Sequence, residues 1–150
     1  MKKKFNITGI CNPNVHYMMD NRAKLDAIMA MVESGEYFTI NRPRQYGKTT
    51  TLQFLQNRID DTEDYLCVKL SFEDVEDVAQ ASDNAFAQMF SIRFMRNLAL
   101  LDSESHIFWK NLDLEITGFE TLSFAITQFV RHTKKQIVLL IAACVHLINQ

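Results

Sequence analysis

Apolar residues spaced for helices alternate along the chain with short runs suited to strands. Apolar positions recur at intervals of three and four over residues 25–32, 52–59, 86–101 and 119–130, which predicts four helices. Residues 37–40 (YFTI) and 65–72 (YLCVKLSF) are rich in β-branched and aromatic residues and predict strands. Residues 137–141 (IVLLI) are wholly apolar, as in a parallel sheet buried on both faces. The alternation predicts an α/β fold with a parallel sheet flanked by helices.

Local signals indicate where these elements begin and end. Gly35 follows the first helix at the position that favours left-handed backbone. The acidic residues within 60–64 (DDTED) follow the second helix, and we expect them to form a solvated turn without metal-ligand spacing. Residues 117–120 (TGFE) match a capping box ahead of the last helix. His106 and Trp109 lie in a stretch of uncertain structure, and we expect both to pack rather than to bind a ligand.

Composition and charge indicate an ordinary globular domain. The 150 residues suffice for one domain, predicted to span residues 1–150, and they are 47% hydrophobic and 23% charged. The net charge of -2 does not indicate direct nucleic-acid binding or attraction to an anionic membrane. Cys11, Cys67 and Cys144 are odd in number and form no C-x-x-C pair, which argues against a disulfide framework and a zinc site. A reducing, cytoplasmic location fits best.

Neither end of the sequence predicts a membrane segment. Lysines follow Met1, but asparagines interrupt any apolar stretch after them, so residues 1–20 are predicted to be an irregular arm and not an export signal. Residues 137–148 are largely apolar but far shorter than the ~20 residues needed to span a bilayer. We therefore expect no membrane partner.

The most informative stretch is residues 36–51 (EYFTINRPRQYGKTTT), predicted to form a strand, a phosphate loop and the start of a helix. Against the pattern G-x-x-x-x-G-K-[ST], Gly47, Lys48 and Thr49 match, whereas Arg42 replaces the first glycine. Gly47 can adopt positive φ, so that successive N–H groups can surround an anion at the start of the helix. A chance tripeptide at a helix start is the alternative interpretation.

Each residue of this loop has a chemical role if it binds a nucleotide. Lys48 would reach the β- and γ-phosphates, and the Thr49 hydroxyl would be a ligand of Mg²⁺. Pro43 contributes no N–H, so the neighbouring arginines would supply charge in place of amides. The candidate phosphate-binding residues are Arg42, Arg44, Gln45, Tyr46, Gly47, Lys48, Thr49 and Thr50. The predicted cofactors are ATP and Mg²⁺.

Four segments together resemble a known family. Residues 16–20 (HYMMD), 37–52 (YFTINRPRQYGKTTTL), 70–72 (LSF) and 137–141 are similar to the predicted AAA-ATPase-like domain of bacterial proteins. These are P-loop ATPases that are often joined to a downstream restriction-endonuclease-like nuclease region. The resemblance covers residues 4–141, and it implies an AAA/ASCE-like P-loop NTPase sheet. In that family the glycine-poor loop is normal.

The chain departs from the family at the position of the Walker B element. The resemblance implies that the strand 137–141 is followed by Asp-Glu, whose Asp holds Mg²⁺ through water and whose Glu polarises the attacking water. Ala142 and Ala143 stand there instead, so we expect hydrolysis to be impaired. The predicted fold is thus a partial P-loop NTPase sheet that lacks the C-terminal strands, with open edges that favour self-association.

This departure suggests a truncated family member, produced by an early stop or a frame change near Ile141. Genomic DNA without a downstream Asp-Glu and ATPase remainder in any frame would exclude truncation. The leading functional prediction is a nucleotide-binding ATPase-like domain, and the alternative is a non-enzymatic interaction fragment with a vestigial phosphate loop. A P-loop small-molecule kinase comes last, because it needs an acceptor-binding acid or a lid for which the sequence offers no candidate.

Overall fold

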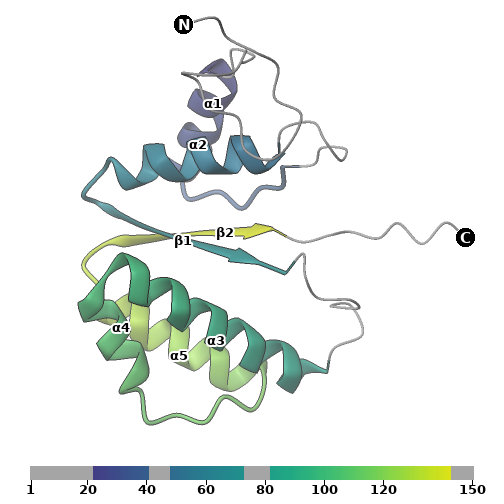
Figure 1. The fold of residues 1–150 in the computed structure, drawn as a ribbon, viewed down its shortest axis with the longest axis vertical. Coiled ribbons are helices and arrows are strands. Elements are labelled where there is room, and N and C mark those ends of the chain that lie inside the picture. Colours follow the sequence, from purple (N-terminus) through teal and green to yellow (C-terminus); the bar gives the residue numbers. More distant parts are fainter. Residues whose placement is uncertain (1–21, 41–47, 73–81, 143–150) are drawn as a thin grey trace, which may run out of the picture. The chain divides into compact units, whose positions relative to one another are not determined.

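A computed structural model of the protein describes residues 22–40, 48–72 and 82–142. Along the chain, its elements are α1 (Arg22–Glu33), α2 (Lys48–Asp60), β1 (Tyr65–Ser71), α3 (Asp83–Leu101), α4 (Ser103–Lys110), α5 (Phe119–His132) and β2 (Gln136–Ala142) (Figure 1). The chain divides into two compact units, Met1–Asp61 and Thr62–Gln150. A single domain over residues 1–150 remains a prediction, and the predicted arm 1–20 lies outside the described residues.

In the first unit, α1 ends in the turn that the sequence predicts. Gly35 adopts a positive φ of 70°. Its N–H donates to the Val32 carbonyl at 3.0 Å, and the Glu36 N–H donates to the Met31 carbonyl at 2.9 Å. This pair of bonds is the Schellman motif, which satisfies carbonyls that the helix end leaves without partners. The predicted role of Gly35 is confirmed.

The segment between α1 and the phosphate loop is not the strand that its composition predicts. Residues 36–40 have no regular secondary structure, and the Tyr37 side chain is fully exposed. A strand requires a neighbouring strand to accept and donate hydrogen bonds, and none of the described residues supplies one here. The prediction of a strand at 37–40 is therefore wrong. The predicted helix that follows is confirmed as α2, and it ends at Asp60 in the acidic turn.

The second unit contains a two-stranded parallel sheet. β1 and β2 pair in register from Tyr65 opposite Gln136 to Ser71 opposite Ala142. Hydrogen bonds extend the pairing at both ends, from the Gln136 N–H to the Asp64 carbonyl at 2.8 Å and from the Phe72 N–H to the Ala142 carbonyl at 2.7 Å. The predicted strands 65–72 and 137–141 and their parallel direction are confirmed, which gives a mixed α/β fold.

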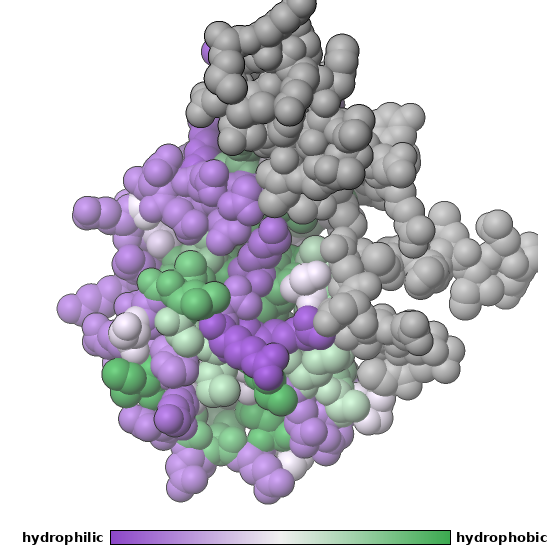
Figure 2. Space-filling model, viewed as in Figure 1, coloured by the Kyte–Doolittle hydropathy of each residue, from purple (hydrophilic) through white to green (hydrophobic). Residues whose placement is uncertain are grey.

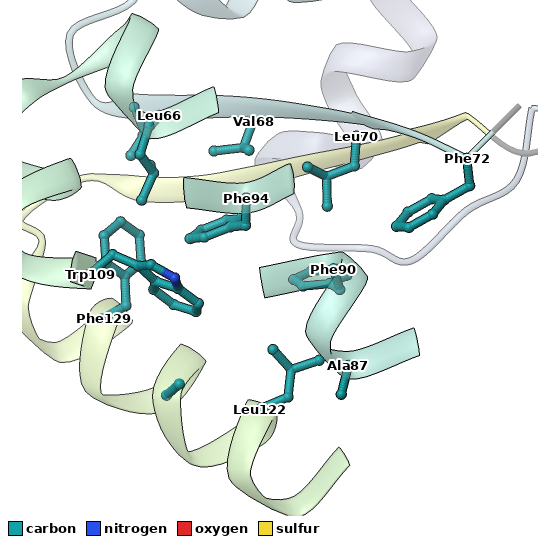
Figure 3. Packing of buried hydrophobic residues seen from close by; sticks show 12 residues of the cluster. Leu66, Val68, Leu70, Phe72, Ala87, Phe90, Phe94, Trp109, Leu122 and Phe129 are labelled. Carbon is teal, nitrogen blue, oxygen red and sulfur yellow. The ribbon is translucent and has the colours of Figure 1, made fainter. Parts of the chain in front are cut away.

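Helices α3, α4 and α5 connect the two strands and pack with β1 around an aromatic core (Figure 3). Alternate residues of β1 point toward these helices, as expected for a strand with one face on a helical layer. The core cluster comprises Leu66, Val68, Leu70, Phe72, Ala87, Phe90, Phe94, Leu98, Trp109, Leu122, Ala125 and Phe129. The predicted packing role of Trp109 is confirmed, because its side chain is buried.

The helical layer covers β1 more completely than β2. Val68 and Leu70 are fully buried, whereas their partners in register, Leu139 and Ile141, remain 37% and 53% exposed. The prediction that strand 137–141 is buried on both faces is therefore wrong. Apolar side chains also reach the surface elsewhere, among hydrophilic ones, as one face of the molecule shows (Figure 2).

Ser82 and Asp102 cap the helices of the crossover. The Ser82 hydroxyl accepts the Ala85 N–H at 3.2 Å at the start of α3. Asp102 lies between the two helices. Its backbone N–H donates a hydrogen bond to the last turn of α3, and its carboxylate accepts the Ser105 N–H at 3.2 Å at the start of α4. The short helix α4 was not predicted, although an aspartate followed by Ser103, Glu104 and Ser105 is a typical helix start.

The start of α5 differs from the predicted capping box. Gly118, not Thr117, is the N-cap residue. The Thr121 hydroxyl, rather than the Glu120 carboxylate, accepts the N–H groups of Thr117 at 2.9 Å and Gly118 at 3.2 Å. The helix consequently begins one residue later than the TGFE pattern implies. None of the helices in the described ranges is long and apolar enough to cross a bilayer.

Candidate phosphate-binding segment

The structure describes only the helical end of the predicted phosphate loop. Five of the predicted contacts lie outside the described residues: Arg42, Arg44, Gln45, Tyr46 and Gly47. Lys48 and Thr49 are the first residues of α2, and the structure describes the backbone of both residues but not their side chains. Thr50 follows them in the helix with a buried side chain. The predicted phosphate and Mg²⁺ contacts of these residues therefore remain predictions.

The position of the helix start is the feature of this segment that bears on chemistry. α2 begins at Lys48, immediately after Gly47, and its first turn carries no acidic residue. The first turn of a helix leaves backbone N–H groups without intrahelical acceptors, and the aligned peptide dipoles place partial positive charge there. An acid in this turn would neutralise that charge. The sequence GKTT thus occupies a helix start whose electrostatics favour an anion.

Thr51, the fourth residue of α2, is a buried polar residue that the sequence did not single out. Its side chain is 1% exposed, and its Oγ1 has no hydrogen-bond partner among the described residues. An unpaired buried hydroxyl costs about 1–3 kcal/mol. Because Thr51 lies one helical turn before Leu55, which is fully buried, it belongs to the buried stripe of α2. We therefore do not count it among the phosphate contacts.

The second part of the predicted site is the Walker B position, which lies at the carboxyl ends of the two parallel strands. β2 ends at Ala142, which is buried and pairs with Ser71, while Ala143 lies outside the described residues. The methyl group of Ala142 can neither bind a metal nor accept a proton. The described residues also contain no cluster of His, Cys, Asp or Glu that could hold a metal ion.

An arginine that the sequence analysis did not identify lies at the carboxyl end of β1. Arg93, in the middle of α3, donates from Nη1 to the Ser71 carbonyl at 2.5 Å. Its guanidinium also lies over the Phe72 ring, 5.3 Å from the centroid. Ligands of open α/β sheets bind beyond the carboxyl ends of the strands. No local motif could identify Arg93, because its contact joins residues 22 positions apart.

The two parts of the predicted site belong to different compact units, residues 48–50 to the first and Ala142 to the second. Their proximity therefore remains a prediction. Comparison with known protein families, with curated proteins and with solved structures yields no match. The AAA-ATPase-like resemblance thus remains a prediction that depends on the sequence motifs. The structure itself defines a mixed α/β protein with a two-stranded parallel sheet.

Proposed function

We propose that the protein is an ATP-binding, AAA-ATPase-like P-loop domain whose capacity for hydrolysis is impaired. The observation that carries the proposal is the start of α2 at Lys48, directly after Gly47, in the sequence RPRQYGKTT. A phosphate loop requires this order of glycine, lysine and helix start. The absence of an acid from the first turn supports the same conclusion, because nothing there opposes an anion.

In this proposal the chain's own residues bind and orient the triphosphate. The amides from Gly47 to Thr50 surround the phosphate oxygens, and the Lys48 ammonium neutralises the terminal charge. Thr49 would hold Mg²⁺, which would supply positive charge to the phosphates. Arg42 and Arg44 add positive charge where the loop lacks its first glycine.

Impaired hydrolysis follows from the alanines at 142 and 143. Phosphoryl transfer depends on positioning and on electrostatic stabilisation, to which the metal carboxylate and the water-polarising acid contribute. A general base alone contributes roughly 10²–10⁴ in rate. With Ala142 at the end of β2, the chain lacks a side chain that could supply either role at that position. We propose nucleotide binding without appreciable turnover.

The test is thermal unfolding with and without ATP and Mg²⁺. A ligand at one hundred times its Kd stabilises the native state by about 2.7 kcal/mol, which raises the melting temperature measurably. Lys48→Ala is expected to abolish this shift. Lys24→Ala is the matched control, because it removes an exposed lysine of α1, in the same compact unit. An unchanged ATP-dependent shift in Lys48→Ala would refute the assignment.

The second candidate is a non-enzymatic interaction fragment with a vestigial phosphate loop. The exposed side chains of Leu139 and Ile141 on a strand favour it. This candidate predicts that ATP leaves the melting temperature unchanged even in the wild-type protein. The same experiment therefore separates the two candidates.

A further inference from the structure

The hydrogen bonds at the ends of the sheet define which groups of β2 point away from β1. The Gln136 N–H and the Ala142 carbonyl both bind β1. In a parallel ladder, alternate residues direct their N–H and C=O groups to the same neighbour. Val138 and Leu140 therefore also bind β1. The backbone groups of Ile137, Leu139 and Ile141 point to the opposite edge.

This outer edge of β2 lacks partners in the described part of the chain. No strand other than β1 pairs with β2 there, and no further hydrogen bond involves Ile137, Leu139 or Ile141. Two of these residues carry the exposed apolar side chains of the strand, Leu139 at 37% and Ile141 at 53%, whereas Ile137 is partly buried, as Val138 is. Unpaired backbone groups and apolar side chains thus coincide.

The outer edge of β1 is different. By the same alternation, Ser71 directs its carbonyl away from β2, and Arg93 donates a hydrogen bond to it. Lys69 places a charge within the strand, as in edges that resist pairing. Only the β2 edge combines unpaired groups with an uncharged sequence, QIVLLIA, among the described residues.

An unpaired strand edge accepts another strand, because only a strand offers a matching row of N–H and C=O groups. The sequence QIVLLIA has no charge, proline or glycine, which is the composition of segments that pair with copies of themselves. Two identical edges related by a twofold axis pair antiparallel, with the same residues contributed by each chain.

We propose that a second copy of this chain pairs with β2, antiparallel and centred on Leu139. In this register Leu139 faces the partner's Leu139, and Ile137 faces the partner's Ile141. All three outward-pointing residues of each chain then occupy hydrogen-bonded pairs, in which facing residues exchange both of their bonds. A shift of register by two residues would leave some of these groups unpaired. The exposed Leu139 and Ile141 side chains become cross-strand neighbours on one face of the joined sheet.

The variant that tests the pairing is Leu139→Lys. It places like charges directly opposite each other at the twofold axis, which opposes pairing. It alters no backbone group that binds β1, because the N–H and C=O of Leu139 point away from β1. The matched control is Leu100→Lys, which makes the same substitution at a leucine of α3 that is 88% exposed. We expect the wild-type protein and Leu100→Lys to form dimers in sedimentation velocity, and the dimer Kd of Leu139→Lys to rise at least about tenfold.

Hydrogen exchange on the wild-type protein provides a second measurement that needs no variant. Dilution from dimer to monomer is expected to accelerate exchange at the amides of Ile137, Leu139 and Ile141 and to leave Val138 and Leu140 protected by β1. A wild-type protein that stays monomeric would overturn the proposal. So would a dimer that Leu139→Lys leaves intact, an association that both lysine variants abolish, or dilution-independent exchange at the three outward amides.

Discussion

Phe129 joins three helices in the core of the second unit. It lies fully buried in α5 and contacts the rings of two other helices edge to face. Its centroid is 5.3 Å from that of Phe94 at 88°, and 5.7 Å from that of Trp109 at 80°. Phe129→Ala removes the ring that joins α3, α4 and α5, so its cost measures how the helical layer is held together.

The expected loss of stability in Phe129→Ala follows from the burial of the ring and from its contacts with other rings. Replacement of a buried phenylalanine by alanine costs about 3–5 kcal/mol through lost burial and the cavity left behind. Each edge-to-face pair contributes about 0.5–1.5 kcal/mol beyond area, and much of that is already contained in the measured range. We expect about 4 kcal/mol. The control is Phe124→Ala in the same helix, where the ring is 55% exposed and the expected change is within about 0.5 kcal/mol.

Urea unfolding followed by tryptophan fluorescence is the assay. Trp109 is the only tryptophan, and its ring lies 4.6 Å from Phe94 in the same core, so the signal reports this unit. If Phe129→Ala populates the unfolded state in buffer, Phe129→Leu provides a smaller loss of about 1–2 kcal/mol that remains measurable. A loss below about 1 kcal/mol for Phe129→Ala, or an equal loss for Phe124→Ala, would refute the packing described here.

Two further predictions concern helix ends. Hydrogen bonds from the Ser105 side chain and backbone hold the pKa of Asp102 below its ordinary value of 3.8, so its stabilising effect is present above that value and is lost as pH falls through the lowered pKa. The stability difference between wild type and Asp102→Asn, from urea unfolding, should shrink on acidification below pH 3.8, and a constant difference would contradict this. Gly35→Ala should cost about 1–2 kcal/mol, because positive φ strains alanine although the added Cβ meets no atom within 4 Å. Unfolding followed by circular dichroism should show a smaller loss of stability for Gly118→Ala than for Gly35→Ala, because the Gly118 backbone is extended. Equal losses of stability for the two variants would exclude backbone strain as the cause.

Much of the fold was predictable where local pattern and tertiary packing agree. The stripe that begins at Phe86 becomes α3 because the aromatic core requires the face that its spacing defines. β1 and β2 formed as predicted because each finds the other as a parallel neighbour. Gly35 was predictable because its conformational freedom is a property of the residue itself.

The failures share a physical cause, which is dependence on partners that the local sequence does not reveal. Residues 37–40 have strand composition but no neighbouring strand within the described ranges. Strand 137–141 is apolar throughout, yet the helices leave part of it uncovered. The capping box at 117–120 gave way to Thr121, whose hydroxyl reaches the same N–H groups.

The candidate site also contains features that the local sequence predicts and features that depend on tertiary packing. The helix start at Lys48 was predicted from the residues themselves, because glycine before a threonine-rich amphipathic segment is a local signal. Arg93 at the carboxyl end of β1 could not be predicted, because α3 brings it there through packing. Ala142 could be identified from the sequence, and it is the last residue of β2.

The proposed function requires that the segment ending in Gly47-Lys48-Thr49 bind ATP. Calorimetric titration of the full chain with ATP, with and without Mg²⁺, tests it most directly. We expect saturable heat with Mg²⁺ and weaker binding without it, because Thr49 would then hold no metal. Lys48→Ala should show no binding, and Lys24→Ala should bind normally. Heat no greater than dilution for the wild-type protein, or equal binding by Lys48→Ala, would contradict it.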